Sequence, residues 1–406
     1  VESTAPPMRL GRVEFTALLA FSMALAALGI DMILPAFGEM RASFGLAEDS
    51  TAVAGTVTAY FFGLAIAQVV YGPLADRFGR KPTLYAGYSI YLLGAVASAL
   101  APSLTALLVA RFIWGLGAAG PRVVTLSVIR DRFDGNEMSR AMSFIMAVFV
   151  LVPIMAPSLG AVVASVSSWR WVFGSCAVLV MLMALWATRL EESLDPADRL
   201  DLRFGRVLAA GRLIVTNRLT MGYTLALTAL FGVFVSYLGS SEIIFGEVFG
   251  AVDEFPLLFG ALAAVMGSAT LANAFVVRRF GTRRMAHGVL FMYVVVAAVF
   301  LGVALATGGR PTLGVFMPTL GAMLSCHSLL IPNFNTIAME PMRPVAGTAS
   351  AVIGTVSTAG GALIGAVIDQ SFDGTILPMA TAFAVLGCVA LGLVIWAERG
   401  RLFERR

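Results

Sequence analysis

The chain has 406 residues, of which 59% are hydrophobic and only 13% are charged. A soluble domain usually carries about 25% charged residues, so the composition excludes an ordinary soluble protein and favours a bundle of membrane helices. Three cysteines (Cys176, Cys326 and Cys388) lie in apolar stretches, without the spacing of a metal site or of a disulfide framework. We interpret them as inert core thiols, and we expect no metal and no cofactor.

Twelve apolar runs, each close to the roughly 20 residues that cross a bilayer, follow one another along the chain. The segment before the first run lacks the cleavage-site pattern of a signal peptide, so we expect that run to be a retained helix. The runs fall into two sets of six: 15–37, 51–75, 83–101, 104–129, 138–165 and 169–188, then 221–245, 256–277, 285–306, 311–337, 345–368 and 375–397. The sequence predicts an all-α membrane protein with twelve transmembrane helices in two six-helix bundles, 1–189 and 221–406, joined by a cytoplasmic linker, 190–220.

The basic residues predict the orientation of the bundles. With the first residue in the cytoplasm, most of the 28 Lys and Arg side chains fall on the inner side, and the outer loops hold only Arg41, Arg170 and Arg310. Such an imbalance is typical of cytoplasmic loops. We therefore expect both chain ends in the cytoplasm of a cell with this protein in its plasma membrane, the inner membrane in bacteria. The linker ends in a basic amphipathic stretch, which either lies on the inner leaflet or is a solvated connector.

A short pattern recurs at the same point of each half. The loop after the second run reads Arg77-Phe78-Gly79-Arg80-Lys81, and the loop after the eighth reads Arg279-Phe280-Gly281-Thr282-Arg283. Transporters that rock around a site near the bilayer midplane are built from such repeated halves. The repeat therefore favours a transporter over a channel. An enzyme is disfavoured because the sequence contains no nucleophile, phosphate-loop or metal-ligand pattern.

Five stretches of the chain resemble those of the major facilitator superfamily. The loop 71–82 (YGPLADRFGRKP) is similar to the family's loop between helices 2 and 3. The stretch 347–350 (GTAS) is similar to the start of helix 11 in the family's drug:proton antiporters. Three others resemble motifs of the drug:proton antiporters, especially the Bcr/CflA-type exporters of bicyclomycin and of florfenicol or chloramphenicol: 30–35 (IDMILP), 111–119 (RFIWGLGAA) and 156–160 (APSLG). Trp114 replaces the family's Gln, Ala156 replaces a Gly, Pro121-Arg122 is extra, and Glu242 stands where relatives have Pro.

This resemblance implies roles for two charged residues that lie inside helices. Charges at bilayer depth are costly and face a partner or a wet cavity. The resemblance implies that Asp31 carries the proton and that Arg111 is its switchable counter-charge, since burial disfavours the charged carboxyl and a nearby arginine favours it. The alternative is a permanent structural pair between the first and fourth helices.

The resemblance also implies an inner gate and a helix 5 motif. The gate is formed by the loop residues, with Asp76 at the start of helix 11 and Arg130 binding it; the alternative is a turn that only sets topology. The gate residues are Asp76, Arg77, Gly79, Arg80, Lys81 and Arg130. Pro153, Pro157 and Gly160 deform helix 5 and permit close packing against helix 8.

Other polar residues inside the runs are candidates for the substrate cavity, each with a structural alternative. Arg122 binds an acidic substrate group or gates the cavity, or else reaches the inner surface. Glu242 faces Asp31 as a second acid, or lies in water at a helix end. Asp369 is expected to face solvent.

A polar stripe on the tenth helix and several aromatic residues complete the predicted cavity. His327 and Asn333 join a proton path, or else form hydrogen bonds between helices. Tyr60, Trp114 and Tyr237 line a drug pocket, although each is individually more typical of packing.

Together these features predict a proton-coupled multidrug or antibiotic efflux antiporter that works by rocker-switch alternating access. We expect a monomer whose partners are a drug-like molecule, protons and the lipid bilayer, without nucleic acid. The alternative is a dedicated proton-coupled transporter of one amphiphilic or anionic metabolite, such as an amino acid, a peptide or a lipid-like molecule, anchored by Arg122.

Overall fold

The computed structural model describes residues 10–199 and 204–403, and within these ranges the regular structure is helical. The first nine residues, the last three and residues 200–203 of the expected linker lie outside the described part. The principal helices are α1 (Arg12–Asp31), α2 (Phe37–Ser43), α3 (Gly55–Phe78), α4 (Arg80–Ala99), α5 (Leu104–Arg132), α6 (Gly135–Val166), α7 (Trp169–Trp186), α8 (Phe204–Thr216), α9 (Arg218–Ile243), α10 (Phe255–Phe280), α11 (Thr282–Ala306), α12 (Leu313–Met339), α13 (Ala346–Asp369) and α14 (Leu377–Ala397). Short turns of 3₁₀ or π-helix join several of them: η1 (Leu34–Ala36), η2 (Ala52–Ala54), η3 (Ala187–Arg189), η4 (Pro196–Asp198), η5 (Ile244–Val248) and η6 (Glu340–Val345).

Eleven helical stretches in the described part of the chain are long and apolar enough to cross a membrane. The one expected span that is not among these eleven is the third, 83–101. It coincides with α4, which has 20 residues and begins with Arg80 and Lys81. Its length suits a bilayer, and its lower hydropathy follows from that basic start and from three tyrosines. The predicted all-α membrane fold is confirmed.

The described residues form two compact units. Unit 1 contains the residues up to Ile33 and Ala59–Phe204, and unit 2 contains Leu34–Thr58 together with the residues from Gly205 onward. The first span therefore contributes α1 to unit 1 and α2 to unit 2. The segment 34–58 packs against α9 through η1 and η2.

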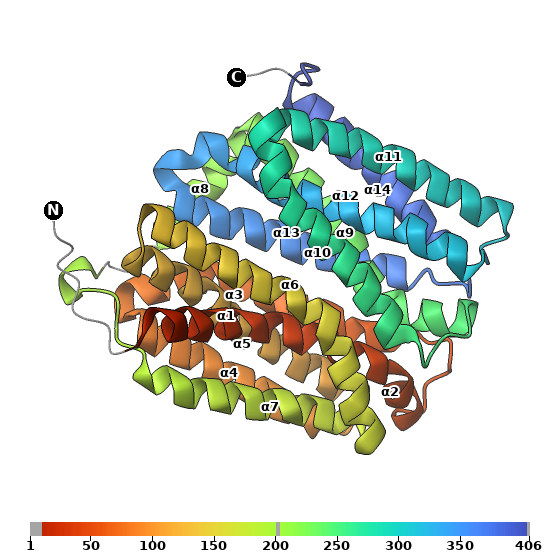
Figure 1. Ribbon diagram of the computed structural model, residues 1–406, viewed down its shortest axis with the longest axis horizontal. Helices are drawn as coiled ribbons and strands as arrows, with labels where there is room; N and C mark the ends of the chain where they lie inside the picture. The colour runs from red at the N-terminus through yellow and green to blue at the C-terminus, as the bar shows by residue number, and fades with distance from the viewer. Residues whose placement is uncertain (1–9, 200–203, 404–406) are drawn as a thin grey trace. The chain divides into compact units, whose positions relative to one another are not determined.

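The helices of unit 1 pack mainly through α1 and α4. Helix α1 contacts α5, α6 and α7, while α4 contacts α5 and α7; Figure 1 shows α4, α5 and α7 running alongside one another. Trp114, Tyr91 and Phe173 are fully buried at the centre, with ring centroids of Trp114 and Tyr91 5.2 Å apart.

Unit 2 repeats this pattern with different residues. Its first long helix, α9, contacts α12, α13 and α14, while α11 contacts α12 and α14. Each of these pairs corresponds, by order in its half, to a pair in unit 1. The internal repeat seen in the loop sequence thus extends to the packing of whole helices.

Candidate functional site

Asp31 lies at a break in the first membrane span. It is the last residue of α1, and the chain continues through an irregular turn and the 3₁₀ segment η1. Pro35 accounts for the break, because proline lacks an amide N–H and disfavours helix in the residue before it. The side chain is 5% exposed and forms no ion pair with any described residue. The sequence motif thus places a buried carboxyl at the end of a broken helix, a position at which transporters bind ions.

Arg111 lies in unit 1 in a cage of aromatic rings. Its guanidinium carbon is 4.6 Å from the ring centroid of Tyr60 and 4.8 Å from that of Trp114. Its Nη1 donates a hydrogen bond of 2.7 Å to the carbonyl oxygen of Gly29, in the last turn of α1. Ring faces and the carbonyl end of a helix both attract a cation, which explains how a fully buried arginine is accommodated.

Asp31 and Arg111 therefore approach the same end of α1 without forming an ion pair. Arg111 binds the backbone two residues before Asp31 and leaves that carboxyl unneutralised. The permanent structural pair that was the alternative interpretation is absent from the described residues.

The two aromatic residues of unit 1 that were predicted to line a drug pocket are packed inside the helix bundle. Tyr60 and Trp114 are both fully buried, and the Tyr60 hydroxyl donates to the carbonyl of Ala26 at 2.8 Å. Arg122 lies further along α5 beside Pro121; it is partly exposed and has no ion pair with a described residue.

Glu242 is buried and paired, contrary to the interpretation as a helix-end carboxylate in water. It is 4% exposed, and Arg41 Nη2 donates to its Oε1 at 2.8 Å. Both residues belong to unit 2, since α2 packs there. Glu242 closely precedes the π-helical turn η5, a distortion that is frequent at functional sites. Sequence reasoning missed Arg41 because 201 residues separate the partners.

The other cavity candidates of unit 2 lie between helices. The ring of Tyr237 stacks on that of Phe259 at 5.5 Å, and the ring of His327 stacks on that of Phe234 at 5.0 Å. Asn333 on α12 donates to Asn273 on α10 at 2.9 Å. All three predicted residues are buried.

The expectation that Asp369 faces solvent is wrong. The side chain is only 3% exposed, and its Oδ1 accepts hydrogen bonds from Ser236 and Ser240 of α9. Asp369 ends α13, but α9 continues beyond this point of contact, and Ser236, Gly239 and Ser240 of α9 enclose the carboxyl. Hydropathy predicts that a carboxyl at a helix end faces water, but it contains no information on whether a neighbouring helix extends beyond that end.

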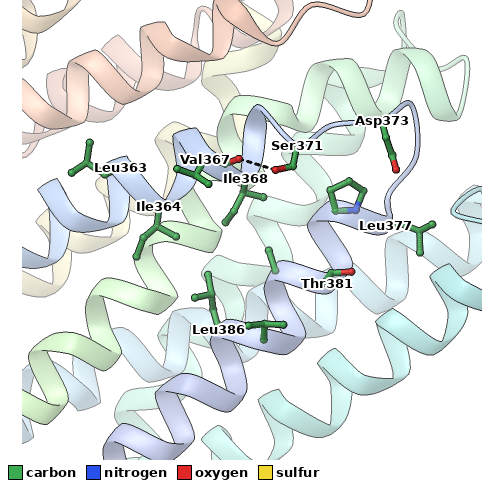
Figure 2. Close-up of a pocket in the computed structure, with 12 residues that line it drawn as sticks. Leu363, Ile364, Val367, Ile368, Ser371, Asp373, Leu377, Thr381 and Leu386 are labelled. Carbon is green, nitrogen blue, oxygen red and sulfur yellow. Dashed lines mark hydrogen bonds between the residues drawn. The ribbon is translucent and has the colours of Figure 1, made fainter.

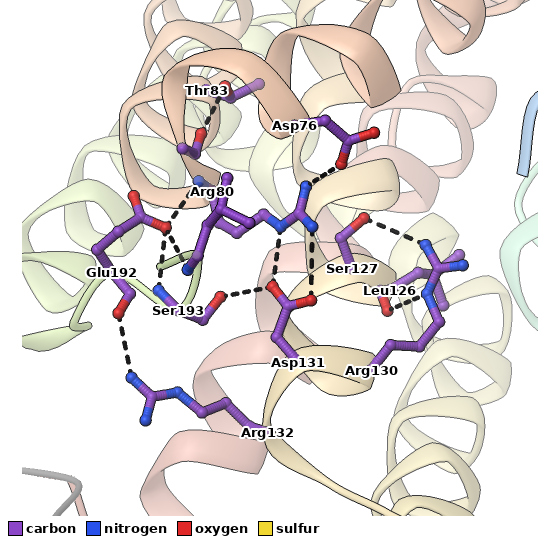
Figure 3. A network of polar contacts seen from close by, with 12 residues as sticks. Asp76, Arg80, Thr83, Leu126, Ser127, Arg130, Asp131, Arg132, Glu192 and Ser193 are labelled. Carbon is purple, nitrogen blue, oxygen red and sulfur yellow. Dashed lines mark hydrogen bonds and ion pairs between the residues drawn. The ribbon is translucent and has the colours of Figure 1, made fainter. Parts of the chain in front are cut away.

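Arg80 is the centre of the predicted gate in unit 1. Its guanidinium donates to Asp76 in α3 and, at 2.8 Å, to Asp131 at the end of α5, as Figure 3 shows. Burial by itself would lower the pKa of Arg80, but the hydrogen bonds to Asp131 and Asp76 raise the pKa above its usual value. Arg80 is therefore a permanent cation that ties two helices together.

The start of the linker is bound to the same loop. Gly79 has φ +105°, which glycine tolerates, and α4 begins at the next residue. The first two amides of α4, those of Arg80 and Lys81, donate to the Glu192 carboxylate at 2.9 and 3.1 Å, because the N-terminus of a helix favours an anion. Lys81 Nζ donates to the carbonyl of Thr188.

Arg130 does not bind Asp76 in this structure. It donates to the carbonyl of Leu126 and to the hydroxyl of Ser127, on its own helix (Figure 3). Arg80 is instead the cation that binds Asp76, and Asp131, the residue after Arg130, binds Arg80 as well. Neither Asp131 nor Glu192 was singled out from the sequence, although each stands among the charges that flank the loop.

The repeated loop of unit 2 has a network of its own. Arg283 contacts Glu340 in η6 and Glu398 after α14, each at 2.6 Å. Tyr223 of α9 donates to Glu398 at 3.0 Å and shares a hydrogen bond of 2.8 Å with His287. Glu398 and His287 are 3% and 1% exposed. Sequence analysis noted Arg283 only as part of the repeat and missed its partners.

Gly160 of the helix 5 motif lies against the broken end of the first span. A Cβ built on Gly160 would meet the carbonyl oxygen of Met32 at 1.9 Å, so a larger residue would push α6 away from the chain next to Asp31. Pro153 and Pro157 both lie inside α6. The predicted contact of this motif with helix 8 stays a prediction.

A separate apolar groove of about 700 Å³ lies between α13 and α14 (Figure 2). Leu363, Val367 and Val385, which line it, are about half exposed or more. None of the predicted cavity residues lines this groove. Among the described residues, no group of three His, Cys, Asp or Glu side chains is arranged to hold a metal ion.

The chain is similar in sequence and in fold to known transporters. The sequence pattern of the Major Facilitator Superfamily matches residues 19–366. The chain is 27% identical to the bicyclomycin resistance protein homolog of Haemophilus influenzae, over 91% of each protein. It is 25% identical to the multidrug resistance protein MdtL of Escherichia fergusonii, over 92% of this chain and 93% of that protein. The solved D-xylose-proton symporter has the same fold: the TM-score is 0.74 over 96% of this chain and 98% of that one, with 14% identity.

Proposed function

The chain belongs to the Major Facilitator Superfamily, and we propose that it exports drug-like small molecules in exchange for protons. It is a multi-pass membrane transporter and not an enzyme. Relatives named for bicyclomycin and multidrug resistance support the substrate class. The basic loops support an orientation with both ends in the cytoplasm, in the inner membrane of a bacterium.

The observation that carries the proposal is the buried Asp31 carboxyl. It lies at the break of the first span and has no ion pair among the described residues. An ionised carboxyl in such a place is costly, so the side chain binds a proton readily and releases it when its surroundings open to water. Arg111, bound to the carbonyl of Gly29 at the same helix end, is the cation that favours release.

One proton per cycle supplies enough free energy for export. Entry down about 1 pH unit and 100 mV yields roughly 3.7 kcal/mol. Since each 1.4 kcal/mol is a factor of ten, this sustains a substrate gradient on the order of a few hundred-fold. A single titrating acid is therefore sufficient for useful efflux.

Alternating access requires moving parts and a gate. We propose that the two six-helix bundles, 1–189 and 221–406, rock about a midplane site, with 190–220 as their linker. The network of Arg80 with Asp76 and Asp131 keeps the inner ends of unit 1 together during this motion.

The test uses purified protein in proteoliposomes with an imposed pH gradient. Cationic drugs, phenicols and amphiphilic anions are screened for substrate-induced proton movement. We expect Asp31→Asn to abolish concentrative transport while leaving substrate exchange without a gradient intact, since the carboxamide cannot carry the proton. Asp49→Asn, at an exposed acid in the loop after α2, is the matched control. Concentrative transport by Asp31→Asn would refute the proposal.

A second function is favoured by one observation. Arg122 is a cation inside a membrane span without an ion pair among the described residues, which suits an anionic metabolite as substrate. A response to one anion only, abolished by Arg122→Ala, would establish this dedicated transporter. A broad response that survives Arg122→Ala would establish drug export.

A further inference from the structure

A second buried carboxyl lies in unit 2, at Asp369. Its Oδ1 accepts a hydrogen bond of 2.8 Å from Ser236 and one of 2.6 Å from Ser240, one turn apart on α9. Its Oδ2 is buried and has no hydrogen-bond partner among the described residues. Ser240 lies eight residues before the end of the span Arg218–Val248, about 12 Å along the helix axis. Asp369 itself is the last residue of the span Ala346–Asp369, so its carboxyl lies at the end of its own helix and is buried against α9.

No cation neutralises this carboxyl in the described part of the chain. On α9 the nearest charge in sequence is Glu242, which Arg41 already pairs. The loop after α13 contributes Asp373, which is exposed and accepts from Thr375. His327 on α12 stacks on Phe234, and the sequences of η2 and α14 contain no charged residue. A buried carboxylate without a cation is costly, and protonation removes that cost.

Oδ2 of Asp369 packs closely against Gly239 of α9, near Ala54 of η2. A Cβ built on Gly239 would lie 2.5 Å from Oδ2 and 3.1 Å from the Cβ of Ala54. A side chain larger than that of glycine at position 239 would therefore displace the Asp369 carboxyl. A metal ion requires several oxygen ligands at coordination distance, whereas a proton needs only the carboxyl oxygen itself.

We propose that Asp369, held by Ser236 and Ser240, is a second proton-binding site and that each transport cycle exchanges its proton together with that of Asp31. In the step, a proton from water bonds to a carboxylate oxygen of Asp369 and gives the neutral acid; the reverse step returns the proton to water on the other side. The two serine hydroxyls bind the carboxyl in either state, because a hydroxyl both donates and accepts. The inference rests on the proposed proton-coupled export.

Proton binding is tested without any substrate, by infrared spectra of the full chain in liposomes over a range of pH. We expect the wild type to show two bands of buried carboxylic acid, of which Asp369→Asn removes one and Asp31→Asn removes the other. Asp373→Asn is the control and should leave both. Ser236→Ala and Ser240→Ala should shift the Asp369 band, since each loses a hydrogen bond to it. A spectrum unchanged in Asp369→Asn would overturn the proposal.

Exchange of the proton is tested by accumulation of an uncharged phenicol, chloramphenicol, at steady state with the membrane potential held at zero. With two protons exchanged, each pH unit supports about a 100-fold gradient, and with one about 10-fold. We expect Asp369→Asn to lower the accumulation from about 100-fold to about 10-fold per pH unit. Asp31→Asn should give no accumulation. A single-proton slope in the wild type would show that Asp369 holds its proton permanently and would overturn the exchange. Accumulation by Asp31→Asn would instead refute the proposed function.

Discussion

The two repeated loops use the same backbone turn and anchor it differently. In both, a glycine with positive φ (Gly79 at +105° and Gly281 at +83°) ends one helix and begins the next. In both, an arginine just after the glycine binds two acids from other elements: Arg80 binds Asp76 and Asp131, and Arg283 binds Glu340 and Glu398. The arginines do not stand at equivalent positions, since Arg80 corresponds to Thr282.

The difference between the loops is the burial of their acids. The side chains of Asp76 and Asp131 are 43% and 21% exposed, whereas that of Glu398 is 2% exposed. Glu192 in unit 1 also binds backbone amides, which no change of the arginine side chain removes. A shared motif therefore specifies a turn and a cation, and the surrounding helices decide how much stability depends on that cation.

The largest expected effect comes from Arg283→Ala. Among the described residues it leaves Tyr223 as the remaining hydrogen-bond donor to the buried Glu398 carboxylate, and removing one partner of a buried ion pair costs about 3–5 kcal/mol. Thermal unfolding in detergent should show a clearly lowered midpoint. Arg278→Ala, at an exposed arginine of the same loop, is the control, and an equal loss there would contradict the assignment.

Arg80→Ala should have a smaller effect, about 1–2 kcal/mol. Asp76 and Asp131 reach water once the guanidinium is gone, and Glu192 still binds the amides of α4. The same unfolding measurement applies, with Arg80→Lys as a partial rescue because lysine keeps the charge but not the planar set of donors. If Arg80→Ala destabilises more than Arg283→Ala, burial of the acids does not explain the difference between the loops.

The smallest effect is expected for Glu137→Gln. Its ion pair with Arg12 lies in water, with side chains 50% and 68% exposed, and such pairs contribute about 0–1 kcal/mol. The unfolding midpoint should match that of the wild type within error, at low and at high salt. A shift comparable with that of Arg80→Ala would show that exposure does not rank these ion pairs.

Much of the candidate site was predictable because its signals are local. Asp31 stands in a short motif that ends in Pro35, and the proline by itself accounts for the helix break. The gate loop was found as a contiguous stretch around Gly79. Asp369, Arg41 and Glu398 were misjudged or missed, because their partners lie on other helices far away in the chain.

By itself the sequence determined the membrane class, the twelve apolar spans, the family and the position of the first buried carboxyl, since hydropathy and short motifs depend only on neighbouring residues. The tertiary structure decided which acids are paired: Arg41 meets Glu242, two serines meet Asp369, and Arg111 meets a carbonyl and aromatic rings. The charge state of a side chain in a membrane interior depends on the groups that contact it, and only the packing of the helices brings those groups together.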